Sequence, residues 1–261
     1  MVLDRYKPES VRRGAIALLY GAACHSLFAL GVGAMIVAMY FGMSQSFGSV
    51  ARPWAIPANL LLLAQFPLAH SLLLTKAGRR LLTRFAPEPH GATLATTTYA
   101  AIASVQLGLL FALWTPSGVI WWQADGPWLA LMTGLYAGSW CLLGIAILQS
   151  GWQLQSGALG WLALLFGRKP VYPDLPFGGL YRFVRHPIYS AFALTLWTIP
   201  TWTPDQLCLA AALTLYCLLA PLHRESSARH SPKTPSQIRS MESRILSALG
   251  CVLAISSTAW S

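Results

Sequence analysis

Long apolar runs that alternate with short polar segments dominate this chain. Several runs approach or exceed the roughly 20 apolar residues that a helix needs to cross a bilayer. The last two are slightly short for a crossing, and the turn sequence Thr-Pro-Asp-Gln at 203–206 joins them into a helical hairpin. The pattern therefore predicts an all-α fold, a polytopic bundle of about six membrane-spanning helices, over residues 15–43, 54–74, 94–114, 127–148, 187–203 and 207–222.

Three segments outside these runs are harder to interpret. Residues 76–90 are rich in basic residues and closed by prolines, which favours a loop. Residues 149–166 contain several Gly and Gln residues, so they form either the end of a long fourth helix or an interfacial segment. Residues 245–256 are a short apolar run, which we expect to be interfacial or packed rather than spanning.

Composition and charge agree with a membrane protein. The chain is 55% hydrophobic and 10% charged, whereas a soluble domain carries about 25% charged residues. A net charge of +10 would suggest nucleic acid as the partner of a soluble protein. If both termini are cytoplasmic, however, every Lys and Arg except Arg52 falls on the cytoplasmic side, as the positive-inside rule requires. The charge pattern therefore requires no nucleic-acid partner, and the expected partner of a membrane-spanning chain is lipid.

The N-terminal segment and the positive-inside pattern together predict a location. The apolar run after the basic N-terminus is too long for the core of a signal peptide, so we expect the first helix to be retained. Retention of this helix and the cytoplasmic basic residues fit a multi-pass protein of a bacterial inner membrane best. The five cysteines lie inside apolar runs without CxxC spacing, which predicts buried, inert thiols and no metal site: Cys24, Cys141, Cys208, Cys217 and Cys251.

The densest run of polar, aromatic and turn residues lies at 178–189, immediately before the hairpin. Pro187 fits the first turn of a helix, which places Arg185 and His186 at its cytoplasmic mouth. The hairpin returns Glu225 to the same membrane face. Because a guanidinium binds carboxylates and a carboxylate binds an ammonium or ribose hydroxyls, this set predicts a site for a zwitterion. Aromatic faces that could hold a sulfonium cation are those of Tyr181, Tyr189 and Trp197.

A structural interpretation of the same residues stays open. The arginines could serve only as positive-inside anchors, and Glu225 could pair with Arg224 or Arg185 solely for packing.

A second polar group lies inside the second apolar run, where Gln65 and His70 are placed at membrane depth. Its imidazole makes His70 the best-placed candidate base in this group. The alternative is that His70 makes a structural hydrogen bond to a neighbouring helix. Gln65 either hydrogen-bonds an acceptor molecule or bridges helices. His25, in the first run, is a weaker candidate.

The motif Gly-x-Tyr-x-x-x-Arg-His-Pro-x-Tyr at 179–189, followed by a hairpin and an acidic residue, resembles the integral-membrane methyltransferase superfamily. That superfamily includes isoprenylcysteine carboxyl methyltransferases and phospholipid methyltransferases. The NnrU-like and methanethiol S-methyltransferase branch is the most similar, and the resemblance covers residues 55–225. It implies S-adenosylmethionine as cofactor, bound on the cytoplasmic side at the hairpin. The matching cofactor-binding positions are Tyr181, Arg185, His186, Tyr189 and Glu225.

The resemblance assigns residues 1–225 to a transmembrane methyltransferase-like domain, with the signature and hairpin at 178–225, and residues 226–261 to a divergent tail. It predicts methyl transfer to a small or lipophilic acceptor, preferably a thiol or sulfide. His70 and Glu225 would be catalytic, and Gln65, His70 and Trp197 would bind the acceptor.

The alternative is a non-catalytic, NnrU-like accessory or binding protein. It is favoured because the family's Phe-Gly-x-x-Tyr segment is missing after Glu225 and Arg224 replaces the first of two acidic residues. A transporter would need repeated acidic groups or symmetric broken helices, which the spans lack.

Overall fold

The computed structural model describes residues 6–173 and 178–229, and the side chains of residues 9–173 and 178–219. The described residues up to Cys217 form one compact unit, and a second unit begins at Leu218 within the last helix. The elements are α1 (Tyr6–Tyr40), α2 (Ala55–Leu73), α3 (Lys76–Arg84), α4 (Gly91–Ala112), β1 (Trp122–Gln123), α5 (Gly126–Gln149), α6 (Trp152–Gln155), α7 (Ala158–Leu165), a 3₁₀ turn (Gly179–Arg182), α8 (Pro187–Trp197), β2 (Thr201–Trp202) and α9 (Pro204–Arg229).

Four helices are long and apolar enough to cross a membrane: α1, α2, α4 and α5. They match the first four predicted spans, and the chain is an integral membrane protein that is mostly helical. The fifth predicted span is shorter than expected, because α8 has 11 residues. At 1.5 Å per residue it covers about 16 Å, roughly half of a hydrocarbon core. The count of six spans and the cytoplasmic termini therefore remain predictions.

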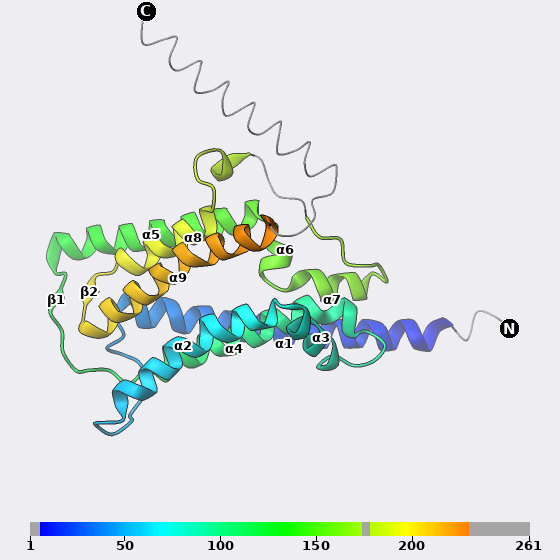
Figure 1. Ribbon diagram of the computed structural model, residues 1–261, viewed down its shortest axis with the longest axis horizontal. Helices are drawn as coiled ribbons and strands as arrows, with labels where there is room; N and C mark the ends of the chain where they lie inside the picture. Colours follow the sequence, from blue (N-terminus) through cyan, green and yellow to red (C-terminus); the bar gives the residue numbers. More distant parts are fainter. Residues whose placement is uncertain (1–5, 174–177, 230–261) are drawn as a thin grey trace, which may run out of the picture. The chain divides into compact units, whose positions relative to one another are not determined.

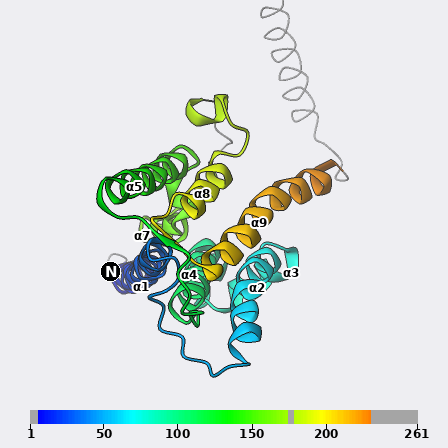
Figure 2. The same ribbon diagram turned by 90° about the vertical axis from the view of Figure 1, so that its left-hand side faces the viewer.

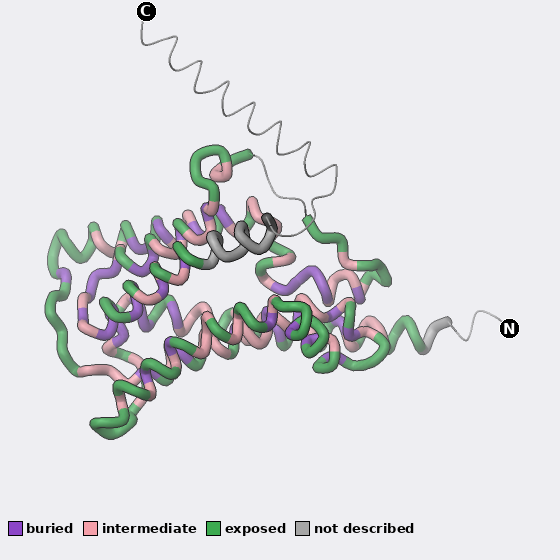
Figure 3. Tube along the Cα trace, viewed as in Figure 1, coloured by how far each residue is buried: buried purple, intermediate pink, exposed green. Residues whose placement is uncertain are grey.

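The core of the first unit lies where the four long apolar helices meet α8 and the first turns of α9. Helix α1 packs along α4, and α5 packs along α8 (Figure 1). Gly31 permits the close approach of α1 to α4, since a Cβ atom there would lie 2.5 Å from the Ser104 carbonyl oxygen. The buried cluster draws Met39 from α1, Phe111 from α4 and Leu196 from α8. Buried positions line the inward sides of these helices and exposed positions their outer sides, as Figure 3 shows.

Two segments between the predicted spans form short helices. The basic segment after the second span contains α3, whose start is capped by Thr75, because the Gly78 N–H donates to the Thr75 Oγ1 at 3.1 Å. The expected loop over residues 76–90 is therefore wrong for its first part. Residues 149–166 fold into α6 and α7 and not into the end of a long fourth helix: Gly151, with a φ angle of 89°, separates α5 from α6, and Gly157, with a φ angle of 78°, separates α6 from α7. Helix α7 packs against both α1 and α4, so it belongs to the core.

The cysteines only partly follow the prediction. Cys24 and Cys217 are buried, but Cys141 and Cys208 are exposed on the outer faces of their apolar helices. The prediction of burial is wrong for these two, because the period of an apolar helix does not distinguish a face that packs on protein from a face that packs on lipid. All four are free thiols. Cys251 and the apolar run at 245–256 lie outside the described residues.

A short two-stranded ribbon and one carboxylate fix the connection between α8 and α9. Strand β1 pairs antiparallel with β2, with Trp122 opposite Trp202. The buried carboxylate of Asp205 accepts three hydrogen bonds: from the Trp114 Nε1–H at 3.0 Å, and from the Ser117 N–H and hydroxyl at 2.8 and 2.5 Å. The connection is thereby tied to the loop that follows α4.

We expect Asp205→Ala to lower the free energy of unfolding by about 2–3 kcal/mol, because it leaves the buried Trp114 N–H without an acceptor. Thermal unfolding of the detergent-purified protein measures this loss. Asp125→Ala is the matched control, since Asp125 is exposed and makes no capping hydrogen bond at the start of α5. Equal melting temperatures for the two variants would contradict the role of Asp205.

Candidate functional site

The signature stretch folds as a 3₁₀ turn that leads into α8. Gly179 adopts a φ angle of 61°, and a Cβ atom at this position would collide with the Gln149 side chain. The Leu180 N–H donates to the Gln149 Oε1 at 2.8 Å, and the hydroxyls of Tyr181 and Ser150 lie 2.6 Å apart. The C-terminal end of α5 therefore holds the turn in place.

Gln149 and Ser150 were not among the residues predicted from the sequence. They precede the signature by about 30 positions and carry no motif of their own. Only the packing of α5 against α8 brings them to the turn.

Three residues of the signature that bear polar groups lie at the start of α8: Arg185, His186 and Tyr189. Pro187 lies in the first turn of α8, as predicted, since an N–H there would have no helical partner, and the residue is buried. Arg185 is exposed and His186 is partly buried. The rings of His186 and Tyr189 lie edge to face, with centroids 6.1 Å apart. A cationic side chain and an aromatic pair are therefore held together at this end of α8.

Gly179→Ala tests whether the turn organises the site. We expect it to weaken binding of S-adenosylmethionine, the cofactor that the signature's family resemblance implies, at least about tenfold, because the turn must shift to relieve a left-handed backbone and the collision with Gln149. Gly178→Ala is the control, since a Cβ atom at Gly178 meets nothing within 4 Å and its φ is extended. Calorimetric titration of the cofactor into both variants compares them, and equal affinities would contradict the expectation.

The polar residues of the second span bridge to α4. The His70 Nε2 lies 2.7 Å from the Tyr99 hydroxyl, and their ring centroids are 5.1 Å apart. The Gln65 Nε2 donates to the Gln106 carbonyl at 2.9 Å, so Gln65 bridges helices, one of its two predicted roles. Tyr99, the partner of His70, was not among the predicted site residues.

Trp197 and His25 make hydrogen bonds that join neighbouring helices. The Trp197 Nε1–H donates to the Thr214 Oγ1 at 2.9 Å, and its ring lies 5.6 Å from that of Trp202. His25 accepts a hydrogen bond from the Trp161 Nε1–H at 3.1 Å, which connects α1 to α7. The backbone of Glu225 belongs to α9, but its side chain is outside those described, so its approach to Arg185 and His186 remains a prediction.

In the part of the chain whose side chains are described, these contacts form four groups. The signature turn contacts the end of α5, His70 and Gln65 of α2 contact α4, Trp197 of α8 contacts α9, and His25 of α1 contacts α7. The hydroxyls of Ser71 and Tyr216, 3.4 Å apart, connect the second group to α9. No set of three or more His, Cys, Asp or Glu side chains able to hold a metal ion occurs within this part.

Apolar spanning helices together with an Arg-His-Pro-x-Tyr turn at the foot of a short helix are typical of an integral-membrane methyltransferase. Curated relatives agree. The chain is 31% identical to the methanethiol S-methyltransferase of Mycobacterium tuberculosis over 78% of its own length and 84% of the relative's. It is 30% identical to methanethiol S-methyltransferase 1 of Bradyrhizobium diazoefficiens, over 77% and 71% respectively. Nurim of Rattus norvegicus is 29% identical over 62% and 63%.

The chain belongs to the methanethiol S-methyltransferase family. No family model and no solved structure matches it.

Proposed function

We propose that this protein transfers a methyl group from S-adenosylmethionine to a small thiol at the cytoplasmic side of a bacterial inner membrane. The observation that carries the proposal is the similarity, over more than two thirds of both chains, to proteins named methanethiol S-methyltransferase. The positive-inside distribution supports the cytoplasmic location of the signature.

The side chains at the N-terminal end of α8 suit the groups of the proposed cofactor. An exposed guanidinium suits a carboxylate, which in our proposal is the methionine carboxylate on Arg185. The edge-to-face pair of His186 and Tyr189 offers an aromatic surface for the sulfonium, and Tyr181 stiffens the turn through Ser150. Glu225 would bind the ammonium or the ribose. The bound cofactor supplies a methyl group already activated on sulfur, so the protein has to orient the reactants and exclude water.

His70 would take the proton from the thiol. This role requires the tautomer in which the Nε2–H donates to the Tyr99 oxygen, because the Nδ1 lone pair is then the proton acceptor. Tyr99 would act as a positioning residue, since its hydroxyl fixes both the tautomer and the ring orientation. Gln65 and Trp197, which bridge to α4 and α9, would shape the walls of the acceptor site.

The test uses the full chain purified in detergent, with methyl-labelled S-adenosylmethionine and methanethiol. We expect labelled dimethyl sulfide to form, with acid or alcohol acceptors giving much less product. Cofactor binding without turnover of any thiol would instead support the non-catalytic accessory protein. Absence of cofactor binding by the folded protein would contradict the proposal altogether.

A further inference from the structure

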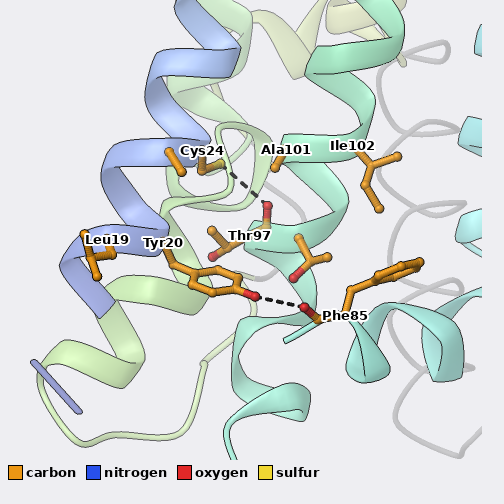
Figure 4. A pocket seen from close by; sticks show the side chains of 9 residues that line it. Leu19, Tyr20, Cys24, Phe85, Thr97, Ala101 and Ile102 are labelled. Atoms are coloured by element: carbon orange, nitrogen blue, oxygen red, sulfur yellow. Dashed lines mark hydrogen bonds between the residues drawn. The ribbon is translucent and has the colours of Figure 1, made fainter. Parts of the chain in front are cut away.

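A pocket that is separate from the residues of the proposed methyl-transfer site opens on the apolar surface between α1 and α4 (Figure 4). Its volume of about 650 Å³ is typical of a ligand site. The exposed surface of its lining is almost entirely apolar and includes Leu19 and Ala23 from α1, Ala101 and Ile102 from α4, and Phe85. An apolar groove on the outer surface of spanning helices faces lipid, and so it suits an acyl chain.

The groove lies near one end of the membrane-spanning helices. Tyr20 lines it only five residues after the apolar run of α1 begins at Ala15, a rise of about 8 Å along the helix. The Tyr20 hydroxyl donates to the Phe85 carbonyl at 2.9 Å, which joins α1 to the residue that directly follows α3. An aromatic residue with a polar tip at this depth is typical of a membrane interface. The mouth of the groove is therefore at headgroup level.

Helix α3 brings positive charge to the same place. Lys76, Arg80 and Arg84 recur every four residues and share one face of the helix, and all three are exposed. The opposite face carries Leu82, which is buried, and continues into Phe85 in the groove wall. The helix is thus amphipathic and basic, as expected of a segment lying in the interface plane of an anionic membrane.

The charges of α3 are not neutralised by neighbouring acids in the sequence. Glu88 is the only acidic residue between Lys76 and His90, against Lys76, Arg79, Arg80 and Arg84. Basic pockets between transmembrane helices on the cytoplasmic side bind the headgroups of anionic lipids.

We propose that this groove binds one anionic phospholipid, with an acyl chain between α1 and α4 and the phosphate on the basic face of α3. The lipid would hold α3 against the helix pair. This site is independent of the methyl-transfer site, because none of the proposed cofactor-binding or acceptor-binding residues lines it.

Native mass spectrometry of the detergent-purified full chain tests the proposal, with dioleoyl phosphatidylglycerol and dioleoyl phosphatidylcholine as probes. We expect phosphatidylglycerol to bind preferentially. Replacing both Arg80 and Arg84 by Gln should weaken its binding about thirtyfold, at about fivefold for each charge removed. Ala101→Trp should weaken binding as strongly, because the indole fills the groove while the charges stay.

Two matched controls isolate the site. Arg52→Gln removes an exposed basic residue whose guanidinium donates to the Ser117 carbonyl, away from the groove. Leu30→Trp adds an indole to α1 at a position that is 71% exposed and outside the groove. Both should keep the wild-type affinity. Equal binding of the two lipids would overturn the proposal, and so would an unchanged affinity in Ala101→Trp, which would reduce the effect to surface charge alone. Arg80 and Arg84 are at exposed positions, so misfolding does not confound the measurement on the variant with both arginines replaced.

Discussion

Replacing His70 by glutamine should lower kcat/KM for methanethiol at neutral pH by about 100- to 1,000-fold, because removal of a positioned general base has effects of this size. The loss should shrink as pH rises, since the free thiol then ionises without help and only the thiolate attacks. Initial rates of dimethyl sulfide formation across the pH range measure both effects.

A second thiol substrate with a lower pKa provides the sharpest control for this prediction. An aromatic thiol that is already ionised at neutral pH needs no base, so His70→Gln should leave its methylation nearly unchanged. A structural role for His70 would instead reduce the rates for both thiols equally. His25→Gln is the matched substitution, because His25 also bonds to an aromatic side chain on another helix, Trp161, but lies outside the proposed site.

Tyr99→Phe distinguishes positioning from catalysis. It keeps the ring packing against His70 and removes only the hydroxyl that fixes the imidazole at 2.7 Å. We expect a loss of up to about tenfold in kcat, the value of one neutral hydrogen bond, with the dissociation constant of the cofactor unchanged. A loss as large as that of His70→Gln would contradict a purely positioning role.

Arg185→Gln should raise the dissociation constant of S-adenosylmethionine by about 30- to 100-fold, because it removes a charge-assisted hydrogen bond to the methionine carboxylate. Arg185→Lys should have a dissociation constant between those of this variant and the wild type, since an ammonium keeps the charge but cannot form the bidentate hydrogen bond. Calorimetric titration with S-adenosylmethionine and S-adenosylhomocysteine measures these constants directly.

Arg182→Gln is the control for Arg185. It removes an exposed arginine three residues earlier, in the 3₁₀ turn, and so changes the net charge of the signature by the same amount. If both substitutions weaken binding equally, the effect is one of general charge and the assignment of Arg185 is wrong. If neither changes the affinity, the cofactor does not use this end of α8.

Figure 2, seen from the end of the helices, shows two pairs of neighbours: α1 and α4 lie together, and α5 lies beside α8. In each pair, packing joins segments that are far apart in the sequence. Local hydropathy cannot reveal such pairs, because a helix face that packs on protein and a face that packs on lipid are both apolar. This is why the exposure of Cys141 and the burial of α7 in the core escaped the sequence pattern. The charges of α3 obscured its helical period for a related reason, since a short basic helix lacks a long apolar run.

The sequence by itself determined the four long spans, the signature turn with Pro187 at the start of α8, and membership in the methanethiol S-methyltransferase family. Each depends on local composition or on a contiguous motif, and both are visible without coordinates. Only the tertiary structure showed that Gln149 and Ser150 hold the turn, that Tyr99 fixes His70 and that Asp205 secures the connection into α9. These contacts join residues about 30 to 90 positions apart, and a buried polar group is paired by whichever neighbour the packing brings to it.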